Sequence, residues 1–416
     1  MASKNANNAK NAENAEKSFP MSDALVPGLI PVRGPELGDT IFEEMGTLGV
    51  VDEENLITLN LGPQHPSTHG VFRLIMHLQG ETVISATPVM GYLHRSTEKL
   101  GEARTYVQGT VLTDRMDYLS PITNNWAYAL AIERLTGMAV PERAEFLRVI
   151  TGELSRIQSH LVAVGTFGMD VGTYGTPLLY ALREREMVLD LLALPTGVRM
   201  NPSYIRYGGV ARDAPPEFFP QLEKFLRIFP SRVDEYERIL TGNEVFRNRT
   251  IGVGMIPPQV ARAYSVTGPI ARASGIDYDV RRAEPYSVYD RFDWDVPVRF
   301  NGDCFDRYMI RILEMRQSTR ILQQALDSIP EGDIRAKLPK VLKPPKGEAY
   351  ARIEGPKGEI GFYLISDGTA NPYRYNVRPP SFVNLTCLSQ IAVGHKLADA
   401  VVILGSFDIV MGEVDR

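Results

Sequence analysis

The sequence predicts an α+β fold with a helical bundle as its core, a small β-sheet before the bundle and a smaller α/β portion after it. Three observations support this prediction. Residues 55–120 begin with short segments rich in Leu, Ile and Val between turn residues, residues 121–330 repeat apolar residues at helical spacing, and residues 331–416 return to strand-like segments. A chain of 416 residues is long enough to bury a sizeable core.

The N-terminal region has the composition of an unstructured segment. Residues 1–20 repeat Asn, Ala, Lys and Glu without an apolar stretch, which predicts a disordered tail and not a signal peptide. The tail also lacks Arg, which counts against a mitochondrial transit peptide. Residues 21–54 are punctuated by Pro and Gly and predict an extended arm. A bacterial cytoplasmic protein is the simplest interpretation.

The first sheet is expected between residues 55 and 88, with at least three strands. Asn55–Leu61 and Val71–Leu78 have strand patterns, and the segment GPQHPSTHG between them predicts a tight connection. His65 precedes Pro66, which favours extended backbone, and His69 stands before Gly70 at the start of the next strand. The two histidines either satisfy carbonyls of a capped turn or have a chemical role, and the segment alone leaves both open.

Four long helices are expected in the bundle. Pro141 suits a helix start, and the apolar residues after it recur every three or four positions. Residues 174–194 carry a second stripe, and residues 216–240 a third helix that Pro230 should kink. The stripe of the Pro141 helix consists of Phe146, Ile150, Leu154, Ile157, Leu161 and Val164.

The last long helix runs from about Phe305 to Leu326 with a heptad-like apolar pattern, and arginines stud its opposite flank. We expect most of these arginines to face solvent, although the pattern also suits a subunit contact. A Pro- and Lys-rich linker follows Pro330, and two strands, Ala349–Glu354 and Glu359–Ser366, are joined by the turn GPKG. The flanking arginines are Arg307, Arg311, Arg316 and Arg320.

Composition excludes several classes of protein. The chain has 45 basic and 50 acidic residues, and this net charge of −5 gives no basic footprint for nucleic acid or an anionic membrane. Its two cysteines, Cys304 and Cys387, show no CxxC spacing, which excludes an all-cysteine iron–sulfur site. The longest apolar runs, such as Ala400–Gly405, are far shorter than the ~18 to 20 residues that span a bilayer.

Eight ordered sequence blocks carry a specific resemblance over about residues 55–416. They resemble the family of the 49-kDa, or D, subunit of respiratory complex I, the bacterial NADH-quinone oxidoreductase. The resemblance implies one integrated unit with the fold of the large subunit of nickel–iron hydrogenases, but without its metal site. The blocks are GPQHPSTHGVFR, GYLHRSTEK, RTYVQ, DRMDYLSP, ELSRIQSHL, YIRYGGV, GDCFDRYMIRILEMRQS and GSFDIVMGEVDR.

The resemblance implies a quinone site, because reduction of a quinone needs a proton donor for each carbonyl oxygen. His69 and Tyr118 stand where the family donates to the quinone headgroup. Asp170 stands where a family aspartate orients the histidine and stabilises its charged form. Without the resemblance, Tyr118 would be an ordinary core or interface tyrosine. Asp170 would be a solvated residue before Gly172.

Three further positions correspond to residues that lie near a partner-borne iron–sulfur cluster. Arg95 would raise the potential of that cluster by its charge. His160 lies seven residues after Glu153, on the same side of the Pro141 helix. The two side chains could form a buried polar pair, or His160 could be a core histidine with its hydrogen bonds satisfied. Asn201 stands where many relatives carry a histidine, unless the alignment shifts by one residue.

The implied partners are other complex I subunits. They are the cluster-bearing B subunit, the C subunit, the two-cluster ferredoxin-like I subunit and the membrane-embedded H subunit, with NADH and FMN bound elsewhere in the complex. The chain itself would take only quinone as substrate, ubiquinone or menaquinone, and would lie on the cytoplasmic side of the membrane as a peripheral subunit. The rival hypothesis is a scaffold in a hydrogenase-like complex. Cysteine pairs would favour it, and the corresponding blocks, HRSTEK and FDIVMGEVDR, have none.

Overall fold

The computed structural model describes residues 55–173 and 175–416, all within one structural unit. The tail and arm predicted for residues 1–54 lie outside the described residues. Within the described part, long helices and small antiparallel sheets are combined in one chain, which confirms the α+β prediction.

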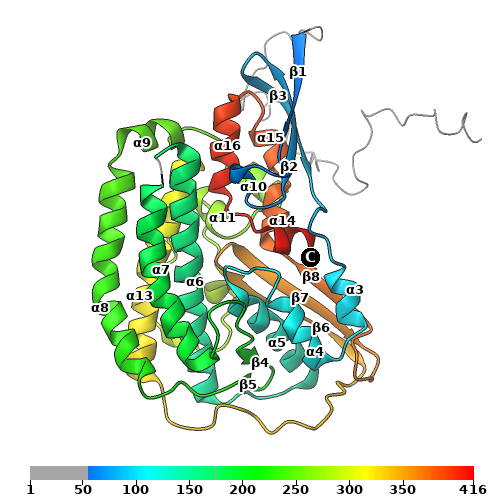
Figure 1. Cartoon of the computed structure of the whole chain (residues 1–416). Coiled ribbons are helices and arrows are strands. Elements are labelled where there is room, and N and C mark those ends of the chain that lie inside the picture. The colour runs from blue at the N-terminus through cyan, green and yellow to red at the C-terminus, as the bar shows by residue number, and fades with distance from the viewer. Residues whose placement is uncertain (1–54, 174) are drawn as a thin grey trace, which may run out of the picture. The chain divides into compact units, whose positions relative to one another are not determined.

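The helical core is built around α6 (Glu142–Val171), which packs against α7 (Thr176–Thr196) and α13 (Cys304–Ser328). Figure 1 shows these helices side by side with α8 (Phe218–Tyr236). Pro141 precedes the first turn of α6, whose two glutamates suit the positive end of the helix dipole. All six apolar residues of the predicted stripe are buried.

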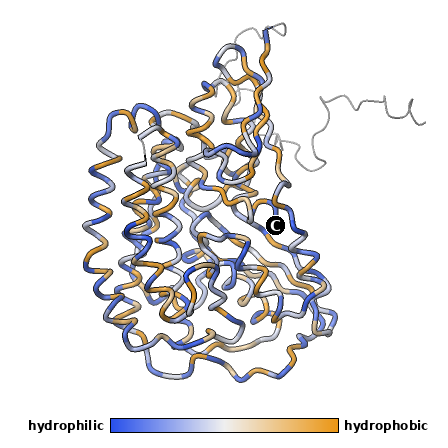
Figure 2. The backbone as a smooth tube through the Cα atoms, in the orientation of Figure 1, coloured by the Kyte–Doolittle hydropathy of each residue, from blue (hydrophilic) through white to orange (hydrophobic). Residues whose placement is uncertain are grey.

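Helix α8 continues through Pro230, and the kink expected there stays a prediction. The departure from α-helical geometry comes later, in a π-helical turn, η3 (Glu237–Thr241). Figure 2 shows hydrophilic residues recurring along the helices. In the part of the chain that the structure describes, no helix is both long and apolar enough to cross a bilayer.

The expectation of solvent-facing arginines on α13 is wrong for its first half. The side chains of Arg316 and Arg320 are 33% and 42% exposed, but Arg307 and Arg311 are buried. Arg307 Nη1 donates to the carbonyl oxygens of Gly254 and Gly302, at 2.9 and 2.7 Å. These acceptors compensate a buried guanidinium, and they come from loops that the helix pattern does not reveal.

The N-terminal sheet consists of β1 (Leu56–Leu61), β2 (Arg73–Gln79) and β3 (Thr82–Val89), antiparallel in this order. It confirms the three expected strands. Alternate residues of β2 are buried, so one face of the sheet packs on the core. In Figure 1 the sheet stands beside α15 (Leu388–Ile391) and α16 (Leu397–Ser406).

The C-terminal sheet consists of β6 (Gly347–Gly355), β7 (Gly358–Ser366) and β8 (Arg374–Arg378). The first two strands and the GPKG turn between them were predicted. This antiparallel sheet packs on α5 (Pro121–Thr136). The remaining elements are α3 (Thr97–Glu102), α4 (Tyr106–Thr113), β4 (Ile205–Arg206), β5 (Gly209–Val210), α9 (Glu244–Thr250), α10 (Pro258–Ala263), α11 (Pro269–Ala273), α12 (Val280–Ala283), η4 (Tyr289–Arg291), α14 (Pro380–Leu385) and α17 (Met411–Asp415).

Candidate functional site

The GPQHPSTHG segment folds as a short 3₁₀ turn, η2 (Pro66–Thr68), between β1 and β2. His65 caps this turn, because its Nδ1 accepts a hydrogen bond from the Ser67 amide at 3.2 Å. A side chain at Gly62 would place Cβ 2.1 Å from the Phe72 carbonyl oxygen, so the loop requires glycine there. The capping interpretation therefore holds for His65, while His69 is left for another role.

His69 contacts Asp170 across 101 residues of sequence. Its Nε2 lies 3.3 Å from Asp170 Oδ2, with side-chain exposures of 13% and 9%. Asp170 is in the last turn of α6, where the helix dipole disfavours a negative charge and favours a cationic partner. Gly405 on α16 allows the close approach, because a Cβ there would lie 2.4 Å from Asp170 Oδ2. The structure thus brings together two of the predicted site residues.

Tyr118 lies in the loop between α4 and α5 and is half-buried. Burial is the largest cause that raises the pKa of Tyr118, followed by the charge of Asp117. The phenol therefore keeps its proton at neutral pH. In the described residues, no hydrogen bond joins Tyr118 to His69.

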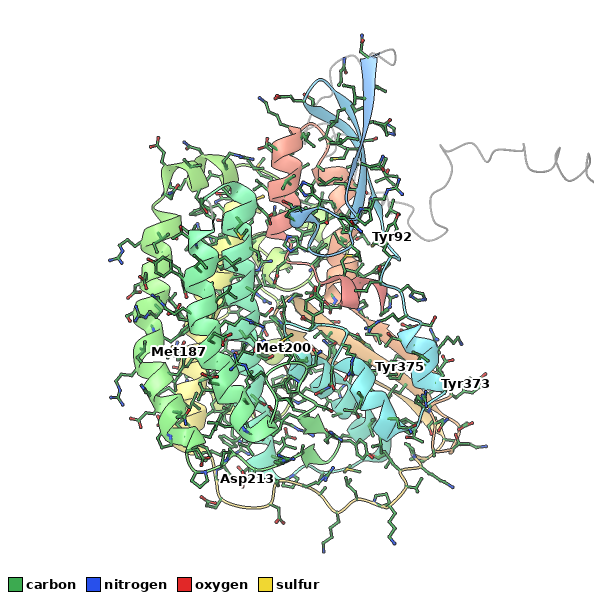
Figure 3. The ribbon with its side chains drawn as sticks, viewed as in Figure 1. Tyr92, Met187, Met200, Asp213, Tyr373 and Tyr375 are labelled. Carbon is green, nitrogen blue, oxygen red and sulfur yellow. The ribbon has the colours of Figure 1, made fainter. Side chains whose placement is uncertain are left out.

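Tyr118 and Asn201 line the same narrow pocket, together with Ser155, Gln158 and Arg199. Asn201 adopts a left-handed backbone with φ 50°, a conformation that asparagine tolerates. Its Oδ1 is buried and has no hydrogen-bond partner among the described residues. Figure 3 labels the neighbouring Met200 between the helical core and the C-terminal sheet in this view.

His160 and Glu153 are both fully buried, but they do not pair with each other. His160 Nε2 lies 2.8 Å from Glu314 Oε2, while Glu153 Oε1 accepts from Arg281 at 3.0 Å. Burial is the largest cause that lowers the pKa of His160, and Glu314 opposes it. This geometry favours the interpretation of His160 as a core histidine.

Arg95 is exposed, and its Nη2 donates to the Arg115 carbonyl oxygen at 3.2 Å. The loop that carries it is tied to the C-terminus, because Asp415 accepts from the amides of Gly91 and Leu93 at 2.8 and 2.7 Å. The blocks GYLHRSTEK and GSFDIVMGEVDR therefore meet in space. Among residues 55–173 and 175–416, no group of three or more His, Cys, Asp or Glu side chains is arranged to hold a metal ion.

Sequence reasoning missed a buried group of charges next to Tyr118. Lys357 Nζ lies 3.3 Å from Asp117 Oδ2 and 3.7 Å from Asp408 Oδ2. Its own segment, the GPKG turn, indicated only a hairpin connection. The sequence carries only a weak signal for this group. Its acidic residues lie in the separate blocks DRMDYLSP and GSFDIVMGEVDR, and their spacing does not indicate a shared site.

Known proteins share extensive sequence similarity with this chain. The family model described as respiratory-chain NADH dehydrogenase, 49 Kd subunit, matches residues 170–345 and 337–416. The NADH-quinone oxidoreductase D 1 subunit of Roseiflexus sp. (strain RS-1) is 56% identical over 368 residues, which cover 86% of this chain and 98% of the relative. The D subunit of the same enzyme from Dehalococcoides mccartyi (strain ATCC BAA-2100 / JCM 16839 / KCTC 5957 / BAV1) is 56% identical over 366 residues, 88% of this chain and 100% of the relative.

The matches to the relatives extend over most of the chain, and the family model covers its C-terminal part from residue 170. They define a subunit of an oxidoreductase complex of the respiratory chain. The chain belongs to the family of the 49-kDa subunit of respiratory-chain NADH dehydrogenase, complex I, whose bacterial relatives are named as the D subunit of NADH-quinone oxidoreductase.

Proposed function

We propose that the chain forms the site for the quinone headgroup in complex I and supplies the protons for quinone reduction. The contact between His69 and Asp170 is the observation that carries this proposal. An imidazole oriented by a carboxylate is positioned to act as a general acid. Tyr118 is the second donor, because its phenol is protonated and only half-buried.

The proton balance assigns one donor to each carbonyl oxygen of the quinone. Two electrons arrive from a cluster in a partner subunit, one proton comes from the Tyr118 hydroxyl, and one comes from the His69 imidazolium. The products are a hydroquinone, a Tyr118 phenolate and a neutral imidazole. Asp170 orients the imidazole for the transfer.

The names of the relatives favour the quinone enzyme over a hydrogenase-like scaffold. Asn201 would face the cluster of the B subunit, since it shares its pocket with Tyr118. Arg95 would face the same cluster. The H subunit would admit the quinone tail from the membrane, and the C and I subunits would complete the peripheral arm on the cytoplasmic side. His160 is a weaker candidate for this environment because its ring is enclosed by this chain alone.

The test is a structure of the assembled complex with a bound quinone analogue. We expect one carbonyl oxygen of the headgroup within hydrogen-bond distance of the Tyr118 hydroxyl and the other within reach of His69 Nδ1, because His69 Nε2 faces Asp170. A complex prepared with His69→Ala serves as the comparison and should bind the analogue less tightly. A headgroup bound away from both side chains in the native complex would overturn the proposal.

A further inference from the structure

Four buried ionisable side chains form a group near Tyr118, and we call them the carboxylate cluster: Asp117, Lys357 and Asp408, which interact with Tyr118, and Glu413, which interacts with Asp117 and Lys357. Each is at most 4% exposed. The loop before α5, the β6–β7 turn, the loop after α16 and the helix α17 contribute one member each. Asp117, Lys357 and Asp408 all influence the ionisation of the Tyr118 hydroxyl.

The cluster has more acids than bases. Lys357 Nζ donates to Ser159 Oγ at 2.7 Å and faces the carboxylates of Asp117 and Asp408. One more cation reaches the cluster, because Arg311 Nε lies 3.9 Å from Asp408 Oδ2. Two cations therefore face three carboxyl groups. Since an unpaired buried carboxylate is strongly disfavoured, the stable state of the cluster holds one proton.

Glu413 is the member best placed to hold that proton. Its Oε2 accepts a hydrogen bond from the neutral Ser381 hydroxyl at 2.5 Å, and its Oε1 is buried without a partner among the described residues. Asp117 and Asp408, by contrast, each face the ammonium group of Lys357. Burial first, and then the charge of Asp117, raise the pKa of Glu413 to about 8.

We propose that Glu413 is the proton store that restores Tyr118 after each quinone reduction. The inference rests on the proposed function of Tyr118 as a donor to the quinone. The Tyr118 phenolate regains one proton, and the Glu413 carboxyl becomes a carboxylate. No electron moves in this step. Asp117 and Lys357 influence the ionisation of both groups and would form the relay, and solvent protons recharge Glu413 before the next turnover.

The sign of the pH effect follows from the raised pKa. Glu413 holds its proton below about pH 8 and loses it as the pH rises through that value. Quinone turnover should therefore fall over this range in the native complex. The charged or titratable groups that face Glu413 are Asp117 and Lys357, and the α14 side that packs on α17 offers only the Ser381 hydroxyl.

The experiment uses the assembled complex in membranes and compares electron transfer from NADH to a short-chain quinone between pH 6 and 9. Glu413→Gln should lower the quinone rate roughly tenfold or more, since general acids commonly contribute at least that much. It should also abolish the fall near pH 8. Glu413→Asp should restore most of the rate. Asp114→Asn is the matched control, because Asp114 is another buried carboxyl with a raised pKa, about 6, outside the cluster.

A second variant protects the test against a failure of Glu413→Gln to assemble. Ser381→Ala removes the hydrogen bond that favours the ionised form of Glu413, so the fall in quinone turnover should move to higher pH. Infrared spectra of the complex with ¹³C-labelled glutamate should show a protonated carboxyl band that titrates with the same shift. A fall that stays in place with Ser381→Ala, or an unchanged rate and profile with Glu413→Gln, would overturn the proton store.

The experiments distinguish a failure of the proton store at Glu413 from a failure of the proposed quinone site. If Glu413→Gln has no effect while Tyr118→Phe abolishes quinone turnover, the donor role of Tyr118 stands and only the store is refuted. If Tyr118→Phe has no effect, the quinone site itself is refuted. Electron transfer from NADH to an artificial acceptor upstream of the quinone should be unchanged in every variant.

Discussion

Replacement of Tyr118 by phenylalanine is the most direct perturbation of the proposed chemistry. The substitution keeps the ring and removes one hydroxyl, which has no hydrogen-bond partner among the described residues. Tyr118 is also only half-buried. The free energy of unfolding should therefore change by no more than about 0.5 kcal/mol, the usual range for substitutions that break no specific contact.

The catalytic effect should be much larger than the structural effect. Loss of one preorganised donor commonly costs about 2 to 4 kcal/mol of transition-state stabilisation. At ~1.36 kcal/mol for each factor of ten, the rate of quinone reduction should fall about 30- to 900-fold. The separation of these two magnitudes distinguishes a proton donor from a packing residue.

The assay compares NADH oxidation by quinone with NADH oxidation by an artificial acceptor upstream, both in the assembled complex. Tyr118→Phe should affect only the first. Tyr373→Phe is the control, since Tyr373 is 70% exposed and lies at the edge of the molecule beside β8, as Figure 3 shows. A native rate of quinone reduction with Tyr118→Phe would refute the assignment of this hydroxyl as a donor.

Three further predictions concern charge. Asp170→Asn removes the carboxylate that faces and orients His69, so the rate of quinone turnover should fall; a native rate contradicts the pairing. Arg148→Met leaves the buried Glu133 without its cation and should lower the free energy of unfolding by about 3 to 5 kcal/mol. Arg316→Met at the surface is the control and should cost about 1 kcal/mol or less. Thermal unfolding of the complex measures both effects. Asn201→His should raise the potential of the cluster that we propose in the B subunit and make that potential more pH-dependent between about pH 6 and 8, as measured by redox titration with electron paramagnetic resonance. A native slope near one proton per electron would contradict this prediction.

The sequence predicts the long helices and both main sheets because the buried face of each element requires apolar residues at a regular spacing. The stripe on α6 and the alternation on β2 are such spacings. It does not predict the burial of Arg307 and Arg311, whose acceptors come from distant loops and from Asp408. A flank of arginines has the same pattern whether its partners are water or carbonyl oxygens. The proposed domain boundaries at residues 120 and 330 and the hydrogenase-like fold stay predictions.

The candidate site shows the same limit more sharply. His69 and Asp170 were paired through the resemblance and not through spacing, and the structure places them in contact. Lys357 was interpreted only as part of a turn. Its carboxylate partners belong to segments far away in sequence, so no local pattern could assign it a role. Contacts that join distant segments are fixed by tertiary packing, which a single sequence does not display.

A comparison of two buried glutamates shows why Glu413, and not Glu314, is assigned the proton. Glu314 is equally buried, but Arg272 Nη2 donates to it at 2.6 Å and His160 lies 2.8 Å away. Burial alone would raise the pKa of Glu314, but the facing charges, Arg272 above all, hold that pKa well below its ordinary value. Glu413 has a serine hydroxyl where Glu314 has a guanidinium, and its pKa moves in the other direction. The same side chain is therefore a fixed charge at one position and a titratable acid at the other, because the number of cations that face it differs.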